Sequence, residues 1–233
     1  MLSFVDDCSV SRATGKVYCS DATRFRAHGK PVGDGSGALT YDLLAPSRLE
    51  GMEAARTGIV FEYDPETREA RTIMKDLWFA NGVHVTYDGS SVLVASTFDA
   101  QVRRYWISGP KAGVEEAFLS PLPGYVDNIS AAPRVGQVWL AFGQPRLDFE
   151  KTLGLPLVRS MIHQLPEPLL PKAQAFGGAV LIDELTGEVL DTLWDPAGTS
   201  LHKVSHVLEK DGKLFFGSFS NTHVSAIEYA YAG

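Results

Sequence analysis

The chain has 233 residues, of which 45% are hydrophobic and 21% are charged. That length and apolar content allow one large domain with a sizeable buried core. With 28 acidic against 21 basic residues the formal net charge is -7, so the basic excess typical of surfaces that bind nucleic acid or anionic membranes is missing. No window approaches the ~18 consecutive apolar residues of a membrane span, and the first residues, with two acids by position seven, do not resemble a signal peptide. The 22 glycines and 13 prolines favour a fold rich in turns.

The first predicted element is a hairpin that turns at residues 12–15. A pairing of Ser11 with Lys16 in this hairpin places Cys8 opposite Cys19. A bridge between directly paired antiparallel strands is usually strained, and a free cysteine serves well as a small core residue. We therefore expect two free cysteines, with one disulfide bond as the alternative.

One local pattern occurs four times: a short apolar run ends in a small polar residue, a turn follows, and a second apolar run begins 10–12 residues later. The first runs lie at 4–6, 79–81, 125–128 and 203–205, and their partners lie at 17–18, 92–94, 138–140 and 214–216. The 47 residues from Asn81 to Asn128 are about the length of one four-stranded propeller blade. The neighbouring intervals of 75 and 77 residues each hold a long extra segment, about 26–56 and about 144–176, which we interpret as insertions.

Two further strand–turn–strand patterns, at 59–74 and 179–193, supply outer strands. We therefore predict an all-β fold, a β-propeller of the six-bladed type with about four blades, as a single domain over residues 1–233. The glycine run at 33–37 is expected to form a hairpin tip within the first insertion.

One stretch in the second insertion departs from the strand pattern. Apolar residues recur there at every fourth position, at Leu153, Leu157, Met161 and Leu165. This spacing predicts a short amphipathic helix within 147–165 that packs on the propeller, with Pro156 in its first turn or interrupting it.

Polar residues occupy equivalent positions on the predicted inner strands, which a propeller brings together at its central axis. They are Asp6, Asn81, Asp127 and Asn128. Carboxylate and amide oxygens suit a hard cation, Ca²⁺ above all and Mg²⁺ or Mn²⁺ less well. The same residue types are common at turns and strand ends, so the pattern alone leaves a purely structural role open.

Several motifs spread over nearly the whole chain resemble the strictosidine synthase-like family, and within it the adipocyte plasma membrane-associated protein group. They include Phe-Ala-Asn-Gly-Val at 79–83, Tyr-Val-Asp-Asn-Ile at 125–129 and further runs at 3–7, 61–65, 104–113 and 209–219. The family is similar to six-bladed propellers that include paraoxonases and gluconolactonases. The resemblance implies a catalytic Ca²⁺ at the axis, held by Asn and Asp of the inner strands and by a Glu of the first blade.

The resemblance carries over to individual positions of this chain. Asn81 matches the metal ligand of the family's Phe-x-Asn-Gly motif, and Asp127 and Asn128 match the paired ligands of its Asp-Asn-Ile motif. Asp6 stands where many members have Asn, and Asp7 matches the Asp of that Val-Asn-Asp motif. The implied ligands of a Ca²⁺ ion are therefore Asp6, Asn81, Asp127 and Asn128.

Two departures from the family pattern concern the start of the chain. Two blades precede the Val-Asn-Asp motif in the family, whereas three residues precede Phe4 here, and the Glu ligand of the first blade has no counterpart. We therefore expect the chain to correspond to the last four blades of six, as a truncated chain or with two blades supplied from elsewhere. Asp6 and Asp127 together still provide two negative charges without that Glu.

The catalytic residue of strictosidine synthase itself is a Glu on the strand before a Glu-x-Asp-Gly turn. Aligning that turn on residues 209–212 puts Ser205 at the Glu position. A serine cannot do the acid–base work of a carboxylate near neutral pH without help, which argues against the lyase reaction. The neighbouring His206 is a candidate general base, with an ordinary strand histidine as the alternative.

These observations predict a calcium-dependent hydrolase of small esters or lactones, similar to arylesterases, with Asp127 and His206 as catalytic residues. We expect a small-molecule substrate, no nucleic acid and no membrane span. The alternative is a non-catalytic interaction propeller that keeps the ion for stability. The sequence leaves the compartment and the oligomeric state open, although family members are often endomembrane or secretory.

Overall fold

The computed structural model describes residues 2–33, 36, 38–42, 44–146, 155–164 and 175–231. In these ranges the strands form four antiparallel sheets and one small hairpin. The first sheet, in spatial order, is β1 (Val5–Val10), β2 (Val17–Asp21), β5 (Gly58–Asp64) and β6 (Glu69–Leu77). The second is β7 (Ala80–Val85), β8 (Ser91–Ser96), β9 (Gln101–Trp106) and β10 (Glu115–Leu119). A short 3₁₀ helix, η1 (Thr97–Asp99), links β8 to β9.

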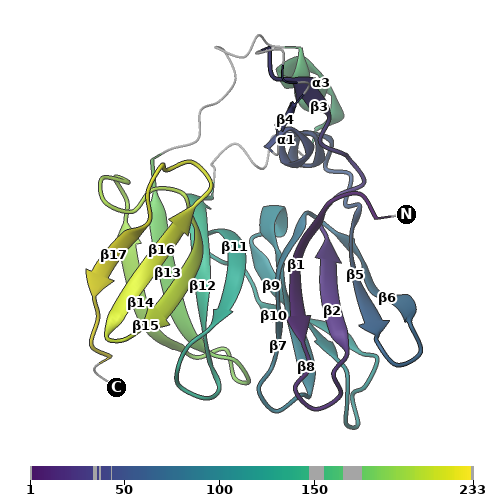
Figure 1. The fold of residues 1–233 in the computed structure, drawn as a ribbon, viewed down its shortest axis with the longest axis vertical. Helices are drawn as coiled ribbons and strands as arrows, with labels where there is room; N and C mark the ends of the chain where they lie inside the picture. The colour runs from purple at the N-terminus through teal and green to yellow at the C-terminus, as the bar shows by residue number, and fades with distance from the viewer. Residues whose placement is uncertain are drawn as a thin grey trace.

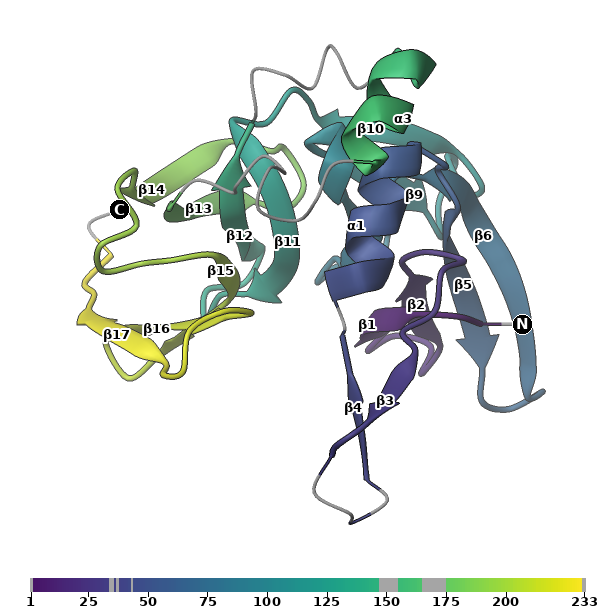
Figure 2. The ribbon, with the colours of Figure 1, turned by 90° about the horizontal axis from the view of Figure 1, so that it is seen from above.

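The third sheet consists of β11 (Gly124–Ala131), β12 (Gln137–Pro145), β13 (Gly177–Asp183) and β14 (Val189–Asp195). The fourth has three strands in the described residues, β15 (Val204–Lys210), β16 (Lys213–Ser218) and β17 (Ser225–Glu228). The first strands of successive sheets contact one another, β1 with β7, β7 with β11 and β11 with β15, so the sheets stand around a common centre (Figures 1 and 2). The protein is therefore an all-β propeller with four blades in the described residues, as predicted.

The pairing registers confirm the repeat that the sequence indicated. The inner hairpins pair Ser9 with Tyr18, Val83 with Val94, Ile129 with Leu140 and Val207 with Phe216. The two additional hairpins are β5–β6 and β13–β14. Apolar runs bounded by turns were sufficient to locate these strands, because strands of the middle blades such as β8 are buried on both faces.

The hydrophobic core consists of three layers, one between each pair of neighbouring blades. Val60, Met74 and Val92 lie in the layer between the first and second blades. The layer between the second and third blades contains Leu93, Leu140 and Ile182, and the layer between the third and fourth contains Trp139, Leu181 and Phe216. Because each layer draws on two sheets, the blades stabilise one another rather than folding around separate cores.

The segment between β2 and β5 carries the hairpin β3 (Gly29–Pro31)–β4 (Leu39–Tyr41) and the helix α1 (Leu44–Glu53), which lie at one end of the propeller (Figure 1). The hairpin agrees with the predicted turn, whose residues 34, 35 and 37 lie outside the described residues. The helix was not predicted. Its Glu50 is fully buried and accepts hydrogen bonds from the hydroxyls of Thr23 and Thr57, each at 2.7 Å. The Glu50 carboxylate thus links α1 to Thr23, which follows β2, and to Thr57, which precedes β5.

The second insertion contains the helix α3 (Pro156–His163). Pro156 is its first residue, which agrees with the predicted alternative that places this proline in the first turn. The helix is shorter than the expected 147–165, of which residues 147–154 and 165 lie outside the described residues. Leu157 and Met161 are 74% and 62% exposed. None of the helices in the described part of the chain is long and apolar enough to cross a membrane.

The expectation of two free cysteines was wrong. Ser11 N–H donates to the Lys16 carbonyl at 2.8 Å, as predicted, and this register sets Cys8 against Cys19 with their Cα atoms 4.1 Å apart. That separation is typical of the closer cross-strand pairs of an antiparallel ladder. The two cysteines form a disulfide bond.

One glycine controls how closely the second and third blades approach. A Cβ atom on Gly82 of β7 would lie 2.5 Å from the Ile129 backbone nitrogen and 2.6 Å from the Asn128 Cα. No side chain fits in that space, so the two inner strands touch backbone to backbone.

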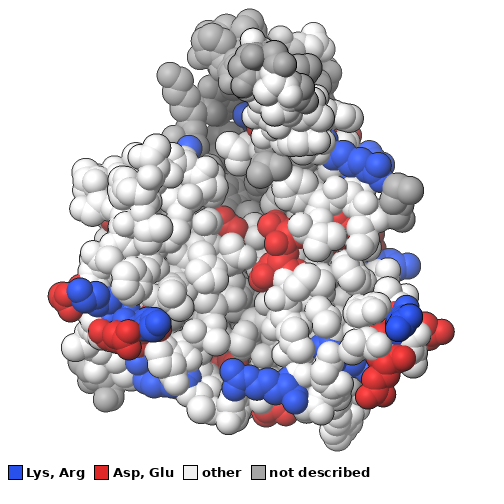
Figure 3. Space-filling model, in the orientation of Figure 1, with Lys and Arg blue, Asp and Glu red and all other residues white. Residues whose placement is uncertain are grey.

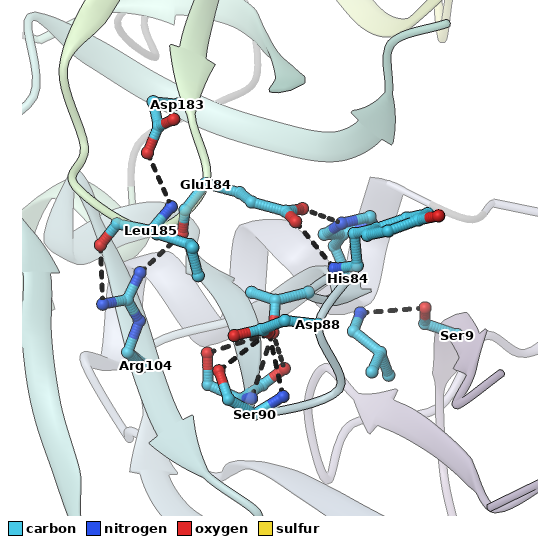
Figure 4. Close-up of polar contacts among 12 residues, drawn as sticks. Ser9, His84, Asp88, Ser90, Arg104, Asp183, Glu184 and Leu185 are labelled. Atoms are coloured by element: carbon cyan, nitrogen blue, oxygen red, sulfur yellow. Dashed lines mark hydrogen bonds and ion pairs between the residues drawn. The ribbon is translucent and has the colours of Figure 1, made fainter. Parts of the chain in front are cut away.

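A buried glutamate links the same two blades at the far end of β7. Glu184, next to β13, accepts a hydrogen bond from the Tyr87 backbone N–H at 2.6 Å and pairs with His84 Nε2 at 2.7 Å (Figure 4). Arg104 of β9 donates to the carbonyls of Glu184 and Leu185. His84 thus has a structural partner, and removing the carboxylate would leave buried polar groups unsatisfied.

Replacing Glu184 by alanine should therefore lower the free energy of unfolding by about 2–3 kcal/mol. Urea unfolding followed by tryptophan fluorescence measures this change. Glu188→Ala, which removes the same charge from an exposed position, is the control and should be nearly neutral. Equal midpoints for the two variants would show that the Glu184 contacts contribute nothing.

The Gly82→Ala variant should be destabilised by about 2 kcal/mol or more, because its methyl group meets backbone atoms that cannot yield without separating β7 from β11. Thermal unfolding measures the loss. Gly33→Ala, at an exposed glycine with open space around it, should leave the melting temperature within a degree or so. Similar melting temperatures for both variants would contradict the close packing.

Candidate functional site

Side-chain hydrogen bonds join the inner strands of neighbouring blades near the axis. The Val83 N–H donates to Asp7 Oδ2 at 2.8 Å, and the Val85 N–H donates to Ser9 Oγ at 3.0 Å. These strands belong to different sheets, so their facing backbone groups need side-chain partners. Asp7 therefore has a defined structural task in linking β1 to β7.

Asn81 lies at the start of β7, where Gly82 brings that strand against β11. Its side chain is only 6% exposed, and its Oδ1 atom is buried with no hydrogen-bond partner among the described residues. The Asn81 side chain also lies close enough to Asp127 to stabilise the charged carboxylate. A buried oxygen without a partner is costly in a folded protein, so this atom is suited to bind a ligand that supplies positive charge.

The Asp127 side chain on β11 is half-buried in the cluster. Burial raises the pKa of Asp127 to about 8, and repulsion from Asp6 and Asp7 adds to the rise, whereas the Asn81 amide opposes it. Burial, and then repulsion from Asp7, raises the pKa of Asp6 to about 6. Solvent still reaches Asp6, and we attribute its shift to the protein atoms that crowd the carboxyl.

Asn128 connects the cluster to the fourth blade. Its Nδ2 donates to the Ser205 carbonyl oxygen at 2.9 Å and approaches Asp127 Oδ1 at 3.4 Å. Since these hydrogen bonds use the amide nitrogen, the side-chain carbonyl oxygen of Asn128 is available as a further ligand for a cation. Ser205 thus lies beside the cluster, at the position where the lyase carries a glutamate.

The four predicted ligands therefore gather at the axis, on β1, β7 and β11. All their free donor atoms are oxygens, which fits a hard divalent cation. No group of three or more His, Cys, Asp and Glu side chains that could hold a metal occurs in the described ranges, so a cation here depends on the amide oxygens of Asn81 and Asn128. Figure 3, in the orientation of Figure 1, shows acidic side chains in the middle of the visible face.

The structure does not bring His206 into this cluster. Its ring nitrogens each lie 3.3 Å from Ser130 Oγ, and no described contact joins the ring to Asp127. Its catalytic role stays a prediction.

A cavity of about 650 Å³ adjoins the cluster at Asp6. Residues 2–5 form one part of its lining, and Arg26, Ala27 and Tyr41 contribute from the segment between β2 and β5. The sequence analysis interpreted this segment as an insertion and gave no role to Arg26. It also missed Gly82, although the Asn-Gly pair was visible as a motif.

The family model for strictosidine synthase matches residues 40–110. Strictosidine synthase-like protein 1 of Arabidopsis thaliana is 34% identical over 169 residues, which cover 70% of this chain and 42% of that protein. Adipocyte plasma membrane-associated protein of Salmo salar is 32% identical over 235 residues, which cover 97% of this chain and 52% of that protein. The chain thus spans about half the length of the curated relatives it matches.

Two solved structures show the same fold at low sequence identity. A luciferin-regenerating enzyme superposes with a TM-score of 0.52 at 12% identity, over 92% of this chain and 53% of the other. A gluconolactonase from Xanthomonas campestris superposes with a TM-score of 0.51 at 15% identity, over 91% and 53% of the two chains. The family model, the sequence relatives and the shared propeller agree, and the chain belongs to the strictosidine synthase-like family.

Proposed function

We propose that this propeller is a calcium-dependent hydrolase of esters or lactones with arylesterase-like activity. The observation that carries the proposal is the buried, unpartnered Oδ1 of Asn81 beside the Asp127 carboxyl. The lactonase named among the structural neighbours supports hydrolysis, because its fold serves that chemistry. Ser205, at the position of the lyase glutamate, does not favour ring-forming condensation.

Asp6, Asn81, Asp127 and Asn128 would hold the cation. When bound, Ca²⁺ supplies a Lewis acid that polarises a carbonyl and favours negative charge on its oxygen. The residues themselves contribute two carboxylates, whose pKa values are raised mainly by burial and further by charge repulsion, from Asp6 and Asp7 on Asp127 and from Asp7 on Asp6. Ligand binding here relieves that repulsion.

The proposal assigns proton transfer to the carboxylates. Asp127 is the predicted base, and the Asp6 carboxylate is a second candidate. Asp6 reaches both the cluster and the adjoining cavity. A water molecule beside a substrate in that cavity would therefore have a carboxylate within reach.

Purified protein should hydrolyse phenyl acetate or simple lactones in the presence of calcium and lose this activity with a chelator. Asn81→Leu should lower the calcium-dependent rate by at least ~10²-fold, because it removes a donor oxygen from a low-dielectric site. Asn221→Leu is the matched control in the fourth blade and should retain the wild-type rate.

Activity that is unaffected by chelator and by Asn81→Leu would overturn the proposal. Thermal stabilisation by calcium without turnover of any of these substrates would instead favour a non-catalytic propeller that keeps the ion for stability.

Stability without a cation should depend on pH in a defined direction. The pKa values of Asp6 and Asp127 are raised above the ~3.9 of an unfolded aspartate, so the folded state binds more protons between about pH 4 and pH 8. The free energy of unfolding in chelator should therefore fall as the pH rises through this window. Calcium should offset the fall, because it competes with these protons.

Melting temperatures recorded at about pH 5 and about pH 8, each with calcium and with chelator, test this. Calcium should raise the melting temperature more at the higher pH, and Asp127→Asn should reduce the difference. An equal calcium effect at both pH values in the wild type would contradict the prediction.

A further inference from the structure

The cavity beside Asp6 is open to solvent and has the volume of a small-molecule site. Its volume of about 650 Å³ falls within the range of ligand pockets, ~300–1,000 Å³. The described residues that line it are Leu2, Ser3, Phe4, Val5, Asp6, Arg26, Ala27 and Tyr41. Apolar side chains therefore line the same cavity as one acidic and one basic residue.

The wall that leads to Asp6 is held in place by a buried carboxylate. Asp21 accepts hydrogen bonds from the backbone N–H groups of Ser3 at 3.1 Å and Phe4 at 2.6 Å. The Phe4 carbonyl in turn accepts from the Ala22 N–H at 2.8 Å. These bonds fix the chain before β1, so this side of the cavity is preformed.

The wall that carries Arg26 is anchored through the buried Glu50. Thr23 donates to Glu50 at 2.7 Å and accepts from the Phe25 N–H at 3.2 Å. The Arg24 N–H donates to Thr57 Oγ1 at 3.0 Å. Arg26 therefore follows directly on a segment whose backbone is held at several points.

Arg26 differs from the other arginines of this region in having no acidic partner among the residues that the structure describes. Arg24 pairs with Glu53, Arg48 with Asp42 and Arg56 with Asp99. Arg26 is exposed, and within the described ranges no carboxylate pairs with it. An unpaired guanidinium is thus free to bind an anion in a protein whose net charge is -7.

We propose that Arg26 selects substrates that carry a carboxylate, attached through an apolar or aromatic body to the ester or lactone that is hydrolysed near Asp6. A guanidinium binds a carboxylate through two parallel hydrogen bonds. Phe4, Val5 and Tyr41 would contact the body of such a molecule. This inference rests on the proposed hydrolase function, and it adds the substrate class.

The reaction remains simple hydrolysis. The acyl carbon–oxygen bond breaks, the oxygen of water forms the new bond to the acyl carbon, and the water protons pass to the leaving oxygen and to solvent. The carboxylate that Arg26 binds is unchanged, so Arg26 acts on substrate binding alone.

Two matched substrates test the selectivity. Para-acetoxybenzoate carries the anion, and para-acetoxybenzamide has nearly the same shape without a charge. Arg26→Ala should lower kcat/KM for the benzoate by at least about 10-fold, mainly through KM, and change the benzamide value by less than about 2-fold. Arg26→Lys should retain part of the preference, because it keeps the charge without the planar fork.

Arg24→Ala removes the same charge two residues earlier in the chain and should leave both kinetic values unchanged. Equal losses on the two substrates in Arg26→Ala, or the same selective loss in Arg24→Ala, would overturn the inference.

Binding measurements separate this inference from the hydrolase proposal. If the wild type hydrolyses neither substrate, the hydrolase proposal fails, and calorimetric titration with para-hydroxybenzoate and para-hydroxybenzamide then decides about Arg26. Tighter binding of the benzoate, weakened at least about 10-fold by Arg26→Ala but not by Arg24→Ala, supports a carboxylate site. Equal affinity for the two molecules, or no binding of either, would exclude it.

Discussion

The approach of β7 to β11 at Gly82 determines the arrangement of the axis. Because backbone meets backbone there, Asn81 is held against Asp127 while its Oδ1 is buried without a hydrogen-bond partner among the described residues. A bulkier residue at position 82 would push the second and third blades apart and separate Asn81 from Asp127. The Asn-Gly motif is thus a single unit, in which glycine provides the proximity and asparagine provides the oxygen.

The cluster concentrates like charge that the fold has to tolerate. Asp6 raises the cost of ionising Asp127, and Asp7 raises it for both carboxyls while also linking β1 to β7. Such a cluster lowers the stability of the fold, as functional sites commonly do. The three apolar layers between the blades offset this loss. A site of this kind gains most from a cation, because positive charge relieves repulsion that the fold itself cannot remove.

Much of the fold follows from local sequence pattern, and the exceptions have physical reasons. Apolar runs followed by turns located the four inner hairpins, because these strands pack against neighbouring blades. The helix α1 escaped notice because it contains Pro46 and Gly51 and lacks a clear apolar stripe. It is stabilised by Glu50, whose partners Thr23 and Thr57 lie 27 and seven residues away. The disulfide bond likewise depended on a cross-strand distance, which residue types alone do not fix.

The sequence by itself determined the blade repeat and the oxygen-bearing residues at its axis, Asp6, Asn81, Asp127 and Asn128, because strand period and motif spacing are local properties. The tertiary structure decided which of their atoms lack a partner and that His206 faces Ser130 instead of the cluster. It also decided that Arg26 and Asp6 share a cavity. These outcomes depend on distances between segments far apart in the chain, which only the packing of the blades and of the segment between β2 and β5 sets.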